Sequence, residues 1–133
     1  MRVVGCFLEY DNKFVLVHRL PHKVDGDTRG LPSGKIKQGE SDIDAMKREL
    51  FEETGYQADD AELQLLSIDE FVSPRGDPIT YVTYHAKLGT PHEMVLEESA
   101  HSEYRWVSIK EADAMDDLIH GLHDLFRIVG FMK

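Results

Sequence analysis

Residues 34–56, with the sequence GKIKQGESDIDAMKRELFEETGY, carry the densest pattern in the chain. Ser41 is a residue type that caps helix N-termini, and the acidic residues just after it are favoured there by the helix dipole. Gly55 is a residue type that commonly ends helices. Apolar residues recur between them at helical spacing, namely Ile43, Met46 and Leu50. We therefore predict a helix between Ser41 and Gly55 that buries this apolar stripe.

Three glutamates share one face of the predicted helix. Glu49, Glu52 and Glu53 stand at positions i, i+3 and i+4, which places them within about 100° of one another around the helix axis. Like charges at this spacing destabilise a helix by ~0.2–0.5 kcal/mol per pair. Carboxylates clustered on a rigid element are ligands that Mg²⁺ and Mn²⁺ bind, usually together with substrate phosphates. Taken alone, the triplet also fits a solvated charged face, which is a common feature of helices.

The wider stretch resembles the Nudix box, G-x5-E-x7-R-E-U-x-E-E-x-G-U, where U is a bulky aliphatic residue. The matching residues are Gly34, Glu40, Arg48, Glu49, Leu50, Glu52, Glu53 and Gly55. Tyr56 replaces the final aliphatic residue, and tyrosine can fill such an apolar slot if its hydroxyl finds a partner. The preceding residues 31–35, LPSGK, are similar to the family's L-P-G-G-K, with Ser33 in place of the first glycine. Residues 104–107, YRWV, resemble the family's late strand with its tryptophan.

This resemblance implies an enzyme that hydrolyses a nucleoside diphosphate linked to another group and requires Mg²⁺, with Mn²⁺ as a substitute. The positions that match the family's metal ligands are Glu49, Glu52 and Glu53, with the Gly34 carbonyl as a further ligand. Arg48 matches the residue that orients these glutamates through ion pairs. Glu40 matches the first glutamate of the box, which is either a structural partner or a metal-linked carboxylate.

The general base and the substrate contacts are less firmly placed. The family's base lies in the box in some members, which favours Glu53, and on a loop before the late strand in others, which favours Glu98. The stretch around Glu98 fits an exposed acidic loop equally well. Arg19 and Lys35 flank the loop before the helix, where either side chain could contact phosphate. Aromatic residues in expected strands could stack a base, although they are more often core: Phe7, Phe71, Tyr81 and Tyr84.

Three functions remain open at this point. The chain is near the family's minimal length, which favours cleavage of a nucleoside triphosphate to the monophosphate and pyrophosphate. ADP-ribose and sugar nucleotides are the alternative substrates, and Pro74 lies in the region where related ADP-ribose enzymes carry a proline. A non-catalytic nucleotide-binding regulatory module is a third reading, which degraded glutamates would favour. None of the glutamates is degraded here.

The remaining sequence predicts an α/β (α+β) sandwich with a mixed sheet, in one domain over residues 1–133. Runs typical of strands are 3–8, 14–17, 65–72, 79–88 and 103–108. Residues 21–34 are rich in Gly, Pro and Asp, which indicates a long loop. Residues 109–115 favour a short helix and residues 116–131 a terminal amphipathic helix. The family resemblance implies a Nudix-like α/β/α sandwich whose sheet is partly curled.

Composition limits the partners and the compartment. The net charge is −10 for 133 residues, which disfavours nucleic-acid polymers but leaves small metal-bound phosphate compounds open. No apolar run approaches the ~20 residues of a membrane helix. The single cysteine, Cys6, excludes an internal disulfide, and a cytoplasmic protein is expected. His120 and His123 favour surface or capping roles over a zinc site. Family members often form dimers, so a homodimer is compatible with the resemblance.

Overall fold

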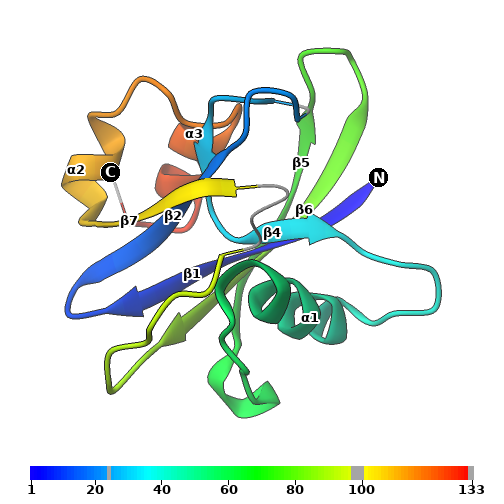
Figure 1. Cartoon of the computed structure of the whole chain (residues 1–133). Coiled ribbons are helices and arrows are strands. Elements are labelled where there is room, and N and C mark those ends of the chain that lie inside the picture. The colour runs from blue at the N-terminus through cyan, green and yellow to red at the C-terminus, as the bar shows by residue number, and fades with distance from the viewer. Residues whose placement is uncertain (24, 97–100, 132–133) are drawn as a thin grey trace.

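The computed structural model describes residues 1–23, 25–96 and 101–131, and it contains a mixed sheet with helices on both faces (Figure 1). The strands are β1 Arg2–Tyr10, β2 Lys13–Arg19, β3 Arg29–Gly30, β4 Ser33–Lys35, β5 Gln64–Val72, β6 Pro78–Lys87 and β7 His101–Val107. The helices are α1 Asp42–Thr54, the 3₁₀ helix η1 Asp60–Glu62, α2 Ile109–Asp113 and α3 Leu122–Ile128. Among the described residues, no helix is long and apolar enough to span a membrane.

The strand order is β3-β2-β1-β6-β5, with β4 also paired to β1 and β7 also paired to β2. β1 and β6 are parallel, and the other pairs are antiparallel. One edge of β1 is divided, because Glu9 and Tyr10 pair with β2 whereas residues 3–5 pair with β4. β2 and β4 therefore pair with different parts of the same edge of β1, and the sheet splits between these two strands. This arrangement confirms the predicted sandwich with a mixed sheet.

Alternation along β1 produces two separate cores, one on each face of the sheet. Val4, Cys6 and Leu8 pack with Met46 and Leu50 under α1. The other face carries an aromatic cluster beneath α2 and α3, formed by Phe7, Phe14 and Phe126 with aliphatic neighbours. Cys6 is fully buried in the core under α1, and this burial raises the pKa of its thiol.

Helix α1 has the boundaries and the buried stripe that the sequence predicts. The Ser41 side chain accepts a hydrogen bond from the Asp44 backbone N–H. Gly55 ends the helix in the left-handed conformation, with φ of 76°, which a residue with a Cβ adopts at a cost. Met46 and Leu50 are fully buried, and Ile43 packs against the same core.

Two sequence predictions about irregular segments are wrong. The expected loop over residues 21–34 contains the short strand β3 and the first residues of β4. The expected helix over residues 116–131 is confined to α3, and Gly121 precedes it with φ of 89°. Residues 117–119 are extended instead, because the Arg29 N–H donates to the Asp117 carbonyl and the Ile119 N–H donates to the Arg29 carbonyl. Pairing of these residues with β3 therefore replaces the helix that the amphipathic pattern predicts.

Candidate active site

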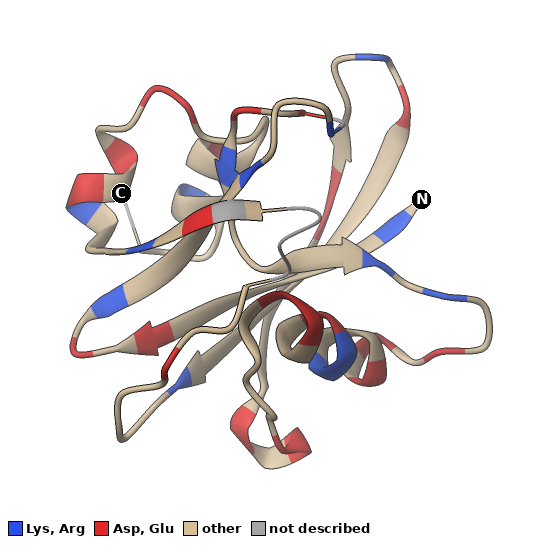
Figure 2. Ribbon diagram, viewed as in Figure 1, with Lys and Arg blue, Asp and Glu red and all other residues tan. Residues whose placement is uncertain are grey.

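Two of the three predicted helix glutamates are buried beside β4, and the third is exposed. Glu49 and Glu53 retain only 9% and 5% of their accessible surface, whereas Glu52 lies on the outer side of α1. Figure 2 shows the acidic segments of α1 interrupted by a basic one. Burying two carboxylates one helical turn apart is costly unless cations or hydrogen-bond donors lie next to them.

Arg48 supplies much of that compensation through five hydrogen bonds. Its Nε and Nη2 donate to the two carboxylate oxygens of Glu40 at 2.8 and 2.9 Å, a bidentate pair. Its Nη1 donates to Glu49 Oε1 at 2.7 Å and to Glu52 Oε2 at 3.3 Å. Its Nη2 also donates to the Lys35 carbonyl at 3.1 Å. Arg48 thus ties the segment before α1 to the carboxylates on α1.

Glu40 is held in its ionised form by this arrangement. The hydrogen bonds from Arg48, aided by the backbone N–H of Lys37, lower the pKa of Glu40 to about 2. Its carboxylate contacts Arg48 and Lys37 N–H. In this structure Glu40 therefore acts as the structural partner of Arg48, one of the two roles that the family resemblance implied for it.

β4 approaches α1 closely enough to contact both buried glutamates with its backbone. The Ser33 N–H donates to Glu53 Oε1 at 2.9 Å. A Cβ added at Gly34 would lie 2.1–2.4 Å from the carboxylate atoms of Glu49, a clash that any other residue would create. Glycine at position 34 therefore allows the β4 backbone to lie directly against the Glu49 carboxylate.

His101 lies next to Glu53 and was not predicted as a site residue. It is 4% exposed, and its Nε2 is 3.9 Å from Glu53 Oε2. Burial lowers the pKa of His101 to about 4, and the nearby side chains of Arg19, Lys23 and His18 lower it further. Its buried Nδ1 has no hydrogen-bond partner within the part of the chain that the structure describes. Position 101 precedes the motif-like YRWV stretch, and the sequence alone carries no spacing signal for it.

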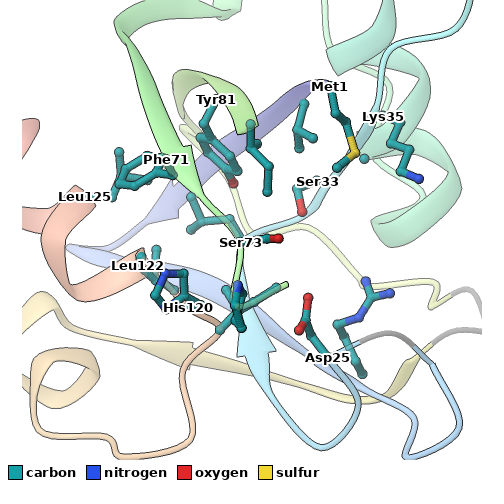
Figure 3. Close-up of a pocket in the computed structure, with 18 of the residues that line it drawn as sticks. Met1, Asp25, Ser33, Lys35, Phe71, Ser73, Tyr81, His120, Leu122 and Leu125 are labelled. Carbon is teal, nitrogen blue, oxygen red and sulfur yellow. The ribbon is translucent and has the colours of Figure 1, made fainter. Parts of the chain in front are cut away.

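A cavity of about 440 Å³ opens on the side of β4 that is opposite α1 (Figure 3). Its apolar lining comes from strands, from the link between β3 and β4, from the segment before α3 and from α3 itself, namely Val3, Leu31, Phe71, Ile79, Tyr81, Ile119, Leu122 and Leu125. Polar groups enter it at a few points only, among them the hydroxyls of Ser33, Ser73 and Tyr81 and the imidazole of His120. Volume and lining of this kind suit a largely apolar small molecule with a few polar contacts.

Charged residues at the cavity are mainly basic although the chain is acidic. Arg19, Lys35 and Arg75 line it together with one acid, Asp25. The chain as a whole has 15 basic and 25 acidic residues, so this surplus of cations is local. A local positive field beside an apolar pocket favours a ligand with one apolar end and one anionic end.

Comparisons with known proteins agree with this geometry. The NUDIX domain family model matches residues 1–126. The chain belongs to the Nudix family. It is therefore a hydrolase of pyrophosphate bonds. A search of curated proteins finds no match.

Solved structures of Nudix proteins share the fold over nearly the whole chain. The MutT protein from Methanosarcina mazei Go1 has a TM-score of 0.82 at 20% identity and covers 97% of this chain and 91% of its own. The NUDIX domain of Shewanella oneidensis NrtR, complexed with ADP ribose, has a TM-score of 0.79 at 22% identity, with 96% and 84% covered. A bifunctional NMN adenylyltransferase/ADP ribose pyrophosphatase from Francisella tularensis, complexed with AMP and a Mn ion, has a TM-score of 0.75 at 20% identity. The match covers 96% of this chain and 40% of the Francisella protein.

The Nudix residues of this chain fit a divalent cation by their chemistry. The donor set consists of oxygen atoms only, which hard cations such as Mg²⁺ prefer. The lack of a side chain at Gly34 leaves its backbone beside the Glu49 carboxylate. Within the described residues, no three acidic, histidine or cysteine side chains are grouped as a complete metal site. In the structure, Arg48 donates hydrogen bonds to Glu49 and Glu52, and the Ser33 N–H donates to Glu53.

The structure brings most of the predicted site residues together around β4. The Nudix-box glutamates and Arg48 lie on its α1 side, and Arg19 and Lys35 line the cavity on the other side. Glu98 lies outside the described residues. Tyr56 finds the partner that its apolar position requires, since its hydroxyl donates to Glu62. His120 is exposed, in line with the surface role that the sequence favours, and it also lines the cavity.

Proposed function

We propose that this Nudix protein cleaves a nucleoside triphosphate to the monophosphate and pyrophosphate with the help of Mg²⁺. One observation carries this proposal: Ser33 and Gly34 belong both to the cavity and to the acidic site. A ligand bound in the cavity would therefore have its polar end within reach of the carboxylates of α1. A nucleoside triphosphate has an apolar base at one end and a polyphosphate at the other.

The base would occupy the apolar end of the cavity, next to Phe71 and Leu122, with the phosphates directed along β4. Lys35 and Arg19 would neutralise phosphate charge, as an apolar pocket with basic flanks suggests. The carboxylates of the box and the Gly34 carbonyl would hold the cation, namely Glu49, Glu52 and Glu53 with Gly34. A cation bound there would neutralise the diphosphate and lower the pKa of water.

The chain's own groups would then handle the proton and the orientation. Glu53 would accept the proton of the attacking water, because its carboxylate is fixed at Oε1 by the Ser33 N–H. Arg48 would keep Glu49 and Glu52 oriented through Nη1, and Glu40 would keep Arg48 in place. Glu98, the other candidate base, would assist or replace Glu53.

ADP-ribose is the second candidate substrate, and one observation favours it. Pro74 lines the cavity beside Arg75, in the region where the family's ADP-ribose enzymes carry a proline. The NrtR structure, which binds ADP ribose, and the Francisella protein, named as an ADP ribose pyrophosphatase, share the fold. ADP-ribose would place a ribose phosphate, instead of pyrophosphate, beyond the cleaved bond.

A substrate panel with product identification tests the proposal. The purified protein is incubated with ribo- and deoxyribonucleoside triphosphates, ADP-ribose and sugar nucleotides, each with Mg²⁺, Mn²⁺ or chelator. We expect metal-dependent release of a nucleoside monophosphate together with pyrophosphate. Release of ribose phosphate from ADP-ribose at higher kcat/KM would favour the second candidate. Tight nucleotide binding without any turnover would contradict both.

A further inference from the structure

One wall of the cavity is formed by α3 and the segment before it. The residues of this wall that line the cavity are Ile119, His120, Gly121, Leu122 and Leu125 (Figure 3). The amphipathic pattern of residues 116–131 predicts a helix, whereas residues 117–119 are extended. Since local preference and the observed conformation disagree here, contacts from elsewhere in the chain must hold this segment in place.

Arg29 of β3 holds the segment through its backbone. Its N–H donates to the Asp117 carbonyl and its carbonyl accepts from the Ile119 N–H, each at 2.8 Å. Arg29 and Leu118 thereby form a parallel β-bridge. A Cβ added at Gly30 would lie 3.1 Å from Ile119 Cγ2, so the Ile119 side chain packs closely on β3. The wall of the cavity therefore rests on a strand of only two residues.

The Arg29 side chain adds two charged contacts to this backbone pairing. Its Nε donates to Asp117 Oδ2 at 2.9 Å, and its Nη2 donates to Glu103 Oε1 at 2.6 Å. Arg29 on β3 and Glu103 on β7 both pair with His18 of β2, so the guanidinium reaches across β2. The Arg29 side chain is 16% exposed, and charged hydrogen bonds at partly buried sites are stronger than those in bulk water. One residue thus fixes both the backbone and the side chain of Asp117.

We propose that Arg29 is a positioning residue for substrate specificity, which holds residues 117–119 extended through Asp117 and thereby places Ile119 in the cavity wall. This inference rests on the proposed function in one respect, namely that the variable part of the substrate occupies the cavity. Arg29 acts through Asp117 and Ile119 and not by contact with the ligand. Without its side chain the segment would follow its helical preference more often, and the wall would change shape.

Arg29→Met removes the guanidinium and keeps an unbranched side chain. The first measurement uses the metal-free protein and follows amide hydrogen exchange at Ile119 by NMR, because this amide donates to the Arg29 carbonyl. We expect exchange at Ile119 to be about 3- to 10-fold faster in the variant, as the loss of a charged hydrogen bond suggests. Arg127→Met is the matched control, since the ion pair of Arg127 is with Asp113 on α2. It should leave exchange at Ile119 unchanged.

Asp117→Ala removes the same ion pair from the other side. Exchange at Ile119 should rise by a similar factor, and adding Arg29→Met in this background should have little further effect. Asp117→Asn should retain most of the protection, because its amide oxygen can still accept from the Arg29 Nε. Unchanged exchange at Ile119 in both Arg29→Met and Asp117→Ala would overturn the proposal.

Steady-state kinetics on several nucleoside triphosphates connects this contact to specificity. Arg29→Met should raise KM about 3- to 10-fold and narrow the difference in kcat/KM between the best and the poorest substrate, while kcat stays within about twofold. A merely structural role would instead lower kcat equally for all substrates and leave each KM unchanged, and that result would overturn the role in specificity. Failure of the proposed function would look different, since the wild-type protein would turn over no nucleotide while the exchange result still decided whether Arg29 holds the wall.

Discussion

The two sides of the site, the acidic side on α1 and the cavity side, are built in opposite ways. The acidic side draws its groups from one helix and the short segment before it, and charged hydrogen bonds from Arg48 hold it together. The cavity side draws apolar groups from strands, from the segment before α3 and from α3 itself, which are far apart in the sequence. The two sides meet at β4 through Ser33 and Gly34.

This difference predicts that turnover and substrate choice can be altered separately. Changes on the acidic side should affect every substrate alike, because each substrate presents the same phosphate linkage there. Changes on the cavity side should alter KM and the order of preference, since the part of the substrate that varies lies there. Variants on either side test that separation.

Glu53→Gln should have the largest effect. The amide cannot accept the proton of water, so kcat should fall by about 10²-fold or more for every substrate, with KM within a few-fold. Steady-state kinetics on two different substrates measures both parameters. Asp44→Asn on the exposed side of the same helix is the control and should retain activity. Full turnover by Glu53→Gln would remove Glu53 from the mechanism and favour Glu98.

Arg48→Lys should come next. Lysine keeps the charge but cannot form the bidentate contact with Glu40 while also reaching Glu49. We expect a loss of about 10- to 100-fold in kcat/KM, together with weaker Mn²⁺ binding by calorimetry. Lys47→Arg, which can keep the ion pair with Asp60, is the neighbouring control. Equal losses in both variants would mean that any change on this helix is harmful and that Arg48 has no special role.

Phe71→Leu should have a smaller effect, confined to the cavity. Phe71 lines the cavity and contacts the ring of Tyr81 edge to face. Loss of an aromatic surface should raise KM about 3- to 10-fold for substrates with a base and leave kcat nearly unchanged. Phe51→Leu, an exposed phenylalanine on α1, is the control. A fall in kcat with constant KM would break the proposed separation of the two sides.

The same contrast explains which parts of the site could be predicted from the sequence. The acidic side was predictable because a helix places residues i, i+3 and i+4 together by its own geometry. The cap at Ser41, the end at Gly55 and the burial of Met46 and Leu50 followed from the same local rules. The spacing of the glutamates could not tell that Glu52 faces outward, because this depends on where β4 packs.

The cavity was not predictable, because strand pairing at long range creates it. Tyr81 and Ser33 both line it although they are 48 positions apart in the sequence, because β6 and β4 both pair with β1. His120 enters the cavity because residues 117–119 pair with β3, the pairing that also shortens the terminal helix. Prediction of His101 beside Glu53 would have required the register of β7 against β2, which no local pattern specifies.

Glu40→Gln should produce the smallest effect, and its dependence on pH identifies the cause. The folded protein lowers the pKa of Glu40 to about 2, whereas the unfolded chain should titrate near the ordinary value of about 4.3. Between these values the unfolded chain binds more protons than the folded one, so stability decreases as the pH falls. The contribution of the Glu40–Arg48 pair is therefore fully present above about pH 4.3 and is lost as the pH falls to about 2.

Urea unfolding of wild type and Glu40→Gln at a series of pH values measures this contribution. The wild type should be the more stable protein at pH 7, and the difference should narrow steadily below pH 4.3 as Glu40 becomes protonated. Glu70→Gln, on the exposed edge strand β5, should show no such convergence. Because Glu40 lies on the acidic side alone, KM should stay unchanged at pH 7 while kcat falls modestly. A rise in KM instead would show that the segment before α1 also shapes the cavity, and the two sides would then be less separable than their construction suggests.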